Sequence, residues 1–137
     1  MYAMTIGSVY VAQIAMGANA EQTLVALREA EAYPGPSLVL AYSHCIAHGF
    51  DLRQGMKQQA LATASGYWPL FRYDPSLRNS GANPFRLDST RPRLKLEDFA
   101  YNELRYSVLT QGDREAAAQM MRQAQAAVDE RYRNYED

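Results

Sequence analysis

The sequence predicts an α/β fold: a partial parallel sheet with one βαβ unit, followed by a loop-rich segment and C-terminal helices. Two short apolar segments, residues 8–16 and 37–43, flank a helical pattern over residues 20–33. Prolines gather in residues 74–93, and a helical period returns in the last third of the chain. The order strand, helix, strand, loop, helices is the basis of the prediction.

The composition is that of one ordinary globular domain. The chain has 137 residues, of which 47% are hydrophobic, and a net charge of −1, which gives no electrostatic case for nucleic acid or membrane. No stretch approaches the roughly 18 apolar residues that cross a bilayer. One cysteine cannot form an internal disulfide. We therefore expect a cytoplasmic protein with no nucleic-acid and no membrane partner.

The first half of the βαβ unit has clear boundaries. Residues 8–16 are rich in β-branched and aromatic side chains and end at Gly17. Asn19 is a good helix N-cap, and Gln22 is spaced as its capping-box partner. A helix over residues 20–33 follows from this start.

The helical period predicts which face of this helix is apolar. Ala20, Leu24 and Leu27 share one face, whereas Gln22 and Glu29 lie on the opposite side. We expect the leucine face to pack against the sheet.

The second strand, residues 37–43, follows the helix-ending sequence Pro34-Gly35-Pro36. Its centre is continuously apolar, which is typical of a strand covered on both faces. A connection of this kind between parallel strands is right-handed in nearly all proteins.

The remaining elements are assigned in chain order. Residues 52–64 are predicted as a helix, and residues 67–73 as an extended aromatic segment. Pro69 argues against a central strand, so this segment is expected at a sheet edge or over the sheet. Residues 74–93 are expected to be mostly loop, with a short strand at residues 85–87.

Two helices are predicted in the last third, over residues 97–108 and 113–135. Apolar residues of the longer helix repeat with a period near 3.6 and define one face: Ala117, Met121, Ala124, Val128 and Tyr132.

Cys45 is the first candidate for chemistry, because it directly follows the second strand. In open α/β sheets the functional crevice lies beyond the carboxyl ends of the strands. His44 and His48 flank the cysteine, but no other Cys or His exists to complete a structural zinc site. Four alternatives stay open from the residues alone: a buried small side chain, a metal pair, a nucleophile, or one ligand of a site completed from elsewhere.

Four strings of the sequence resemble a known family, in their order and spacing: YVAQIAMGAN, EAEAYPGPSLVLAYSHCIAHG, SGYWPLFRYDP and NPFRLDS. They are similar to the thiamine diphosphate-binding domain of pyruvate:ferredoxin (flavodoxin) oxidoreductases. The resemblance implies that residues 1–93 are the C-terminal portion of that α/β domain. Residues 94–137 would be the helical segment that follows it.

The resemblance also implies a function. The family oxidatively decarboxylates pyruvate with CoA to acetyl-CoA and CO2, using thiamine diphosphate and Mg2+, and passes electrons through [4Fe-4S] clusters to ferredoxin or flavodoxin. Cys45 matches the one cysteine of this region that binds a cluster. His44 and His48 would shape its loop. The complete enzyme is expected to be a homodimer.

Several parts of such an enzyme are missing from this sequence. The thiamine-binding signature with its magnesium ligands and the other three cluster cysteines are absent. We therefore expect the chain to be a fragment or a subunit that is inactive alone and binds neither thiamine diphosphate nor a stable cluster. Its expected role is to complete the sheet, present Cys45 and add a helical tail to the dimer. The alternative is a non-catalytic interaction or assembly module derived from that domain.

Overall fold

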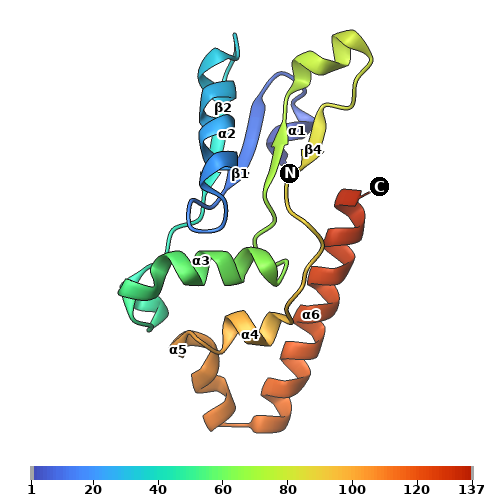
Figure 1. The fold of residues 1–137 in the computed structure, drawn as a ribbon. Helices are drawn as coiled ribbons and strands as arrows, with labels where there is room; N and C mark the ends of the chain where they lie inside the picture. Colours follow the sequence, from blue (N-terminus) through green and yellow to red (C-terminus); the bar gives the residue numbers. More distant parts are fainter. Residues whose placement is uncertain (1, 137) are drawn as a thin grey trace.

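The computed structural model describes residues 2–136, in which a mixed sheet lies beside a layer of helices (Figure 1). Within these residues the strand order is β2-β1-β3-β4. Strands β1 (Tyr10–Ile14) and β2 (Ser37–Ala41) are parallel, whereas β3 (Phe71–Tyr73) and β4 (Phe85–Leu87) continue the sheet antiparallel. The α/β class and the βαβ unit are therefore confirmed, in a sheet that is mixed and not wholly parallel.

Helix α2 (Ala20–Ala32) begins where the sequence predicts. The Asn19 side chain accepts a hydrogen bond from the Gln22 backbone N–H at 2.9 Å, which satisfies one free donor of the first turn. The helix ends before Pro34, as expected from the lack of a backbone N–H in proline.

The predicted buried face of α2 is wrong. Leu24 and Leu27 are 55% and 46% exposed, while Thr23 and Ala26 are buried. Ala26 packs against Tyr10 and other side chains of β1, so small residues set the contact with the sheet. The helix therefore presents its leucines outward.

Strand β2 is one of the two edge strands among the described residues, and the prediction that both of its faces are covered is also wrong for this chain. Leu38 is 40% exposed, and Val39 and Leu40 are only half-buried. Val39 packs on the α2 side and Leu40 on the opposite side of the sheet. The strand is apolar on both faces, but the residues that the structure describes cover it incompletely.

Strand β3 corrects the prediction for the aromatic segment. It lies between β1 and β4, not at an edge of the sheet. Pro69 precedes the strand, and its carbonyl oxygen accepts a hydrogen bond from Gln13 Nε2 at 2.7 Å. A proline in this position removes no ladder donor. The predicted strand at residues 85–87 is confirmed as β4, and η3 (Pro75–Ser80) interrupts the loop between the two strands.

Helix α1 (Tyr2–Thr5) lies against the face of the sheet opposite α2. Its Met4 packs with Val11 and Phe71 of that face. The apolar start of the chain thus adds to the core of the sheet.

The helical layer begins with η2 (Leu52–Gln54) and α3 (Gly55–Ala64), which together confirm the predicted helix over residues 52–64. The predicted helix over residues 97–108 is broken into three short pieces: α4 (Leu96–Ala100), α5 (Leu104–Ser107) and η4 (Val108–Gln111). The break falls where the Glu103 side chain turns into the interior. A buried core joins α3, α4 and the last helix: Ala62, Leu96, Phe99, Ala100 and Val128.

Helix α6 (Arg114–Glu136) matches the predicted long helix and runs from the helical layer to the sheet (Figure 1). Ala117, Val128 and Tyr132 of the predicted face are buried, whereas Ala124 is exposed. Because α3 shares its core with α4 and α6, the division at residue 93 crosses a packed layer, and it stays a prediction. Of the helices in residues 2–136, none has the length and apolar character needed to cross a membrane.

Candidate functional site

The candidate site is the loop after β2, at the carboxyl ends of the two parallel strands. The Tyr42 backbone N–H donates to the carbonyl of Ile14 at 2.9 Å and so extends the strand pairing into the loop. Cys45 is exposed, and its Sγ accepts a hydrogen bond from the Ala47 backbone N–H at 3.5 Å. This contact caps η1 (Ile46–His48). The buried-cysteine interpretation is therefore wrong, and the thiol faces outward at the predicted edge.

His44 contacts Gln59 of α3, and Gln59 also binds the turn that follows β1. Gln59 Oε1 accepts from the Gly17 backbone N–H at 2.8 Å, so the donor Gln59 Nε2 faces His44 Nδ1 at 3.3 Å. Nδ1 therefore accepts, and the neutral ring carries its proton on Nε2. A Cβ at Gly55 would lie 2.5 Å from the ring, which explains the glycine at the start of α3.

His48 faces a buried carboxylate from the helical layer. The Glu103 side chain is fully buried, with Gln58 Nε2 at 3.0 Å from Oε1 and Arg105 Nε at 2.6 Å from Oε2. His48 Nδ1 lies 3.9 Å from Glu103 Oε2 and is buried without a hydrogen-bond partner among residues 2–136. The two histidines of the loop thus contact different elements.

The charges around Glu103 are balanced. Burial lowers the pKa of the Arg105 guanidinium and the hydrogen bond to Glu103 raises it, with a net rise. Burial and a hydrogen bond to Tyr67 raise the pKa of Tyr106 to about 12. Burial, and then the charge of Glu103, raise the pKa of the Tyr42 hydroxyl. At neutral pH Arg105 is therefore the cation that compensates the buried carboxylate, beside uncharged tyrosines.

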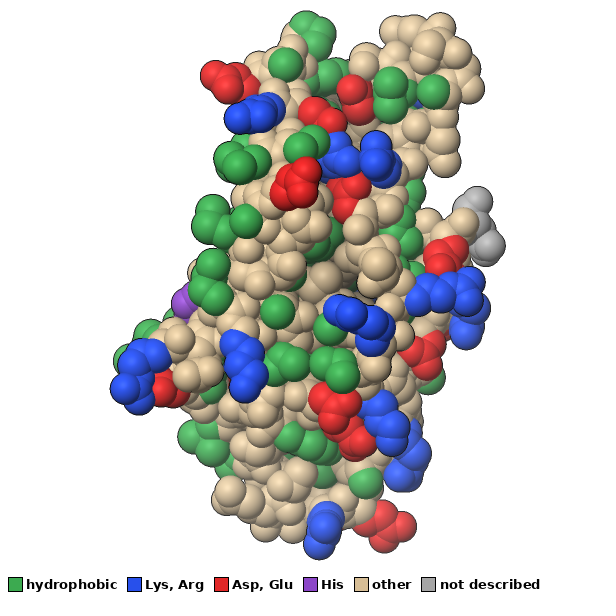
Figure 2. Space-filling view, viewed as in Figure 1, with side chains coloured by type: hydrophobic (Ala, Val, Ile, Leu, Met, Phe, Trp, Pro, Cys, Tyr) green, Lys and Arg blue, Asp and Glu red, His purple; other side chains and the backbone are tan. Residues whose placement is uncertain are grey.

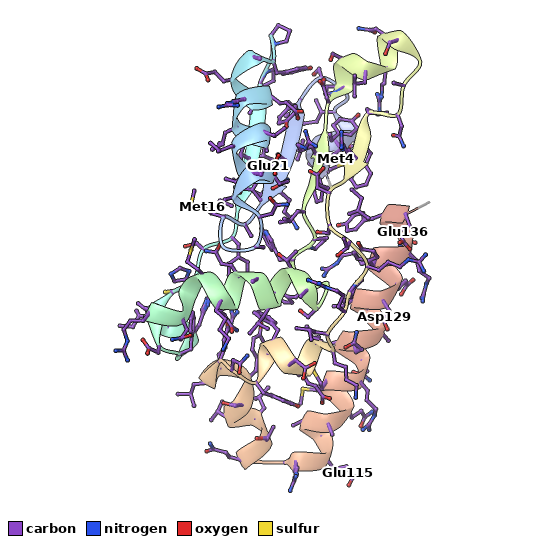
Figure 3. All side chains as sticks on the ribbon, in the orientation of Figure 1. Met4, Met16, Glu21, Glu115, Asp129 and Glu136 are labelled. Carbon is purple, nitrogen blue, oxygen red and sulfur yellow. The ribbon has the colours of Figure 1, made fainter. Side chains whose placement is uncertain are left out.

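Exposed apolar side chains surround the cysteine loop. Figure 3 shows Met16 between α2 and α3, and Figure 2 shows hydrophobic side chains along the same edge of the molecule. The exposed set near the loop and the adjoining start of α3 is Met16, Ile46, Leu52 and Met56. Large apolar side chains in contact with water around one loop are typical of an interaction surface.

A second polar region, between α2 and the β3–β4 pair, is not a candidate site. It is a cleft of about 440 Å³ whose walls include Arg72, Glu29 and Asp88. Arg72 donates to Asp88 at 2.8 and 2.9 Å and to Glu29 at 2.5 Å. These three charged side chains are thus paired within the fold.

Sequence reasoning found the cysteine and its two histidines but missed Gln59, Gly17 and Glu103. Neither Gln59 nor Glu103 belongs to a sequence motif, and no polar pattern around either residue pointed to the loop. Burial of a charged residue was the informative observation, and burial is visible only in the fold. Among residues 2–136, no group of three or more His, Cys, Asp and Glu side chains is placed to hold a metal ion.

Comparison with known proteins identifies relatives along nearly the whole chain. No family model matches. The pyruvate-flavodoxin oxidoreductase of Nostoc sp. is 48% identical over 136 residues, covering 99% of this chain and 11% of the relative. The enzyme of that name from Trichormus variabilis is 49% identical over 99% of this chain and 11% of its own length. The pyruvate:ferredoxin oxidoreductase of Moorella thermoacetica is 43% identical over 98% of this chain and 12% of its own length.

These relatives define the class first: the chain is homologous to one segment of large oxidoreductases named for flavodoxin or ferredoxin. More particularly, it corresponds to a segment of the pyruvate-flavodoxin and pyruvate:ferredoxin oxidoreductases, which confirms the resemblance found in the sequence. The chain spans only about 11% of the length of the first two curated relatives.

Proposed function

We propose that this chain works as part of a pyruvate:ferredoxin or flavodoxin oxidoreductase and contributes Cys45 as one ligand of a [4Fe-4S] cluster. The complete enzyme would convert pyruvate and CoA to acetyl-CoA and CO2 and pass electrons to flavodoxin or ferredoxin. The observation that carries the proposal is the 48% identity with the Nostoc enzyme over 99% of this chain.

The position of Cys45 fits the proposed ligand role. Its thiol is exposed at the carboxyl edge of the parallel strands, on a loop whose flanking histidines face side chains of other elements. When bound, a [4Fe-4S] cluster carries single electrons and takes four thiolate ligands. The sequence holds one cysteine, so three ligands would come from outside it.

The open side of the molecule supports a role within a larger assembly. Strand β2 is an edge strand with exposed leucines beside it, and exposed apolar side chains continue to the cysteine loop. An uncovered apolar strand edge pairs readily with another strand. We propose that the remainder of the enzyme covers this side. We assign no contact with thiamine diphosphate or Mg2+ to the residues of this chain.

A chimera tests the proposed function. This chain would replace the matching segment of the Nostoc relative, and pyruvate- and CoA-dependent reduction of flavodoxin would be measured. We expect the chimera to be active and the isolated chain to be inactive. Activity of the isolated chain, or a folded chimera that lacks activity, would contradict the proposal.

A further inference from the structure

We propose that Glu103, at the corner between α4 and α5, is a positioning residue for the Cys45 loop. The inference rests on the proposed role of Cys45 as a ligand. It adds that the helical layer, and not the sheet alone, sets where the thiol lies. Three observations support it: the burial of Glu103, its approach to His48, and a backbone hydrogen bond between the residues that follow these two, Leu104 and Gly49.

Burial of the Glu103 carboxylate needs a reason. Taking a carboxylate out of water is unfavourable unless each oxygen is paired. Here Oε1 accepts from Gln58 at 3.0 Å, and Oε2 accepts from Arg105 at 2.6 Å. Gln58 also donates to the carbonyl of Phe99 at 3.0 Å, which ties α3 to α4. The carboxylate is therefore fixed in place at the junction of α3, α4 and α5.

The group of the loop that faces this fixed carboxylate is His48. Its Nδ1 lies 3.9 Å from Glu103 Oε2, which is too long for a hydrogen bond. The same Nδ1 is buried without a partner among the described residues, and a buried polar atom of this kind is destabilising. A shift of about 1 Å would bring the two atoms to hydrogen-bond distance. Glu103 thus offers the loop a defined docking point.

The backbone of the corner contacts the loop directly. The Leu104 N–H donates to the Gly49 carbonyl at 3.0 Å. Gly49 has a φ of 73°, and a Cβ there would lie 2.5 Å from Leu104 Cβ. Residues 48 and 49 of the loop therefore meet residues 103 and 104 of the corner in a close contact that only glycine permits.

This contact is well placed to act on the thiol. The Cys45 carbonyl accepts from the His48 backbone N–H at 3.0 Å, so the residue that meets Glu103 also closes the turn that begins at the cysteine. Displacement of His48 would move that turn. A metal ligand needs support of this kind, because a loosely held side chain leaves its ligand position undefined.

Amide hydrogen exchange of the full chain tests the proposal. Glu103→Gln is compared with Glu97→Gln, which changes an exposed carboxylate in the first turn of α4. Loss of the carboxylate charge that faces His48 should raise exchange of the amides in residues 46–50 about tenfold or more, while the amides of β1 keep their rates. Glu97→Gln should leave both sets unchanged.

Two further variants keep the test decisive. His48→Ala should raise exchange in the same residues, and the double variant His48→Ala/Glu103→Gln should add little to either single change. If Glu103→Gln does not fold, Gly49→Ala is expected to give the same local rise. Equal rises in the loop and in β1, additive effects, or no rise would overturn the positioning role. These measurements need no cluster, so they can fail or succeed independently of the ligand role of Cys45.

Discussion

The two edges of the sheet differ in how completely the chain covers them. At the β4 edge the ring of Tyr135, from α6, lies 5.8 Å from the rings of both Phe71 and Phe85. Arg72 of the neighbouring strand is paired with Asp88 and Glu29. At this edge apolar and charged side chains both find partners within the chain.

The β2 edge is the reverse. Leu24, Leu27 and Leu38 are 55%, 46% and 40% exposed, and the cysteine loop continues from this strand. The same four-stranded sheet is thus closed on one side and open on the other. The difference supports the proposal that the remainder of the enzyme covers the edge that leads to Cys45.

The largest expected effect comes from a truncation on the closed side. Phe71→Ala should lower the free energy of unfolding by about 3–5 kcal/mol, because the side chain is 1% exposed and packs between two aromatic rings. The matched change on the open side, Leu38→Ala, should cost less than about 1 kcal/mol in the isolated chain. Urea denaturation of the three proteins measures both. Equal losses would show that the two edges are equally buried.

The second prediction concerns self-association through the open side. Replacing both outward leucines of α2, Leu24→Gln and Leu27→Gln, should weaken concentration-dependent association of the isolated chain, because it removes exposed apolar surface. The thermal midpoint should change little. Sedimentation velocity over a range of concentrations measures the effect, and Arg28→Gln on the same helix is the control. Unchanged association in the double variant would show that this face does not mediate self-association.

The smallest effect is expected from alkaline pH. Unfolded tyrosine ionises near pH 10, whereas the pKa of Tyr106 in the fold is about 12. Between these two pH values the folded chain keeps a proton on Tyr106 that the unfolded chain releases. The contribution of Tyr106 to the free energy of unfolding is therefore fully present below pH 10 and falls as the pH rises toward 12. Tyr106 should contribute less than about 1 kcal/mol to the free energy of unfolding, because the residue is partly exposed.

Denaturation midpoints between neutral pH and about pH 11 measure this decline. Burial and Glu29 also raise the pKa of Tyr10, on β1, so the wild-type slope has more than one source. Tyr106→Phe should make the slope shallower without removing it. A slope that does not change would exclude Tyr106 as a contributor.

Local patterns predicted the elements of this fold well. The Asn19 cap, the proline stop after α2 and the period of α6 each depend on residues close in sequence, and each is confirmed. The place of Cys45 after a parallel strand also followed from chain order, because βαβ geometry fixes which edge the loop occupies.

Burial was harder to predict. The leucines of α2 form an apolar face, but that face is exposed. The helical period identifies an apolar face and does not say whether a neighbouring element covers it. The continuous apolar sequence of β2 predicted a strand covered on both faces, and this prediction failed for the same reason. Pro69 misled because it lies before β3, where its missing N–H removes no ladder hydrogen bond. Glu103 has no local pattern, since its role depends on side chains from α3 and α5.

The most direct test of the account is the iron content of the chimera with the Nostoc relative. Cys45→Ala removes the thiolate, and Ser43→Ala changes an exposed residue of the same loop as a control. Iron would be counted per chain, and the reduced clusters would be observed by electron paramagnetic resonance. We predict that Cys45→Ala loses about four iron atoms and the signal of one cluster, whereas Ser43→Ala keeps both. Full iron and an unchanged spectrum in Cys45→Ala would contradict the ligand role.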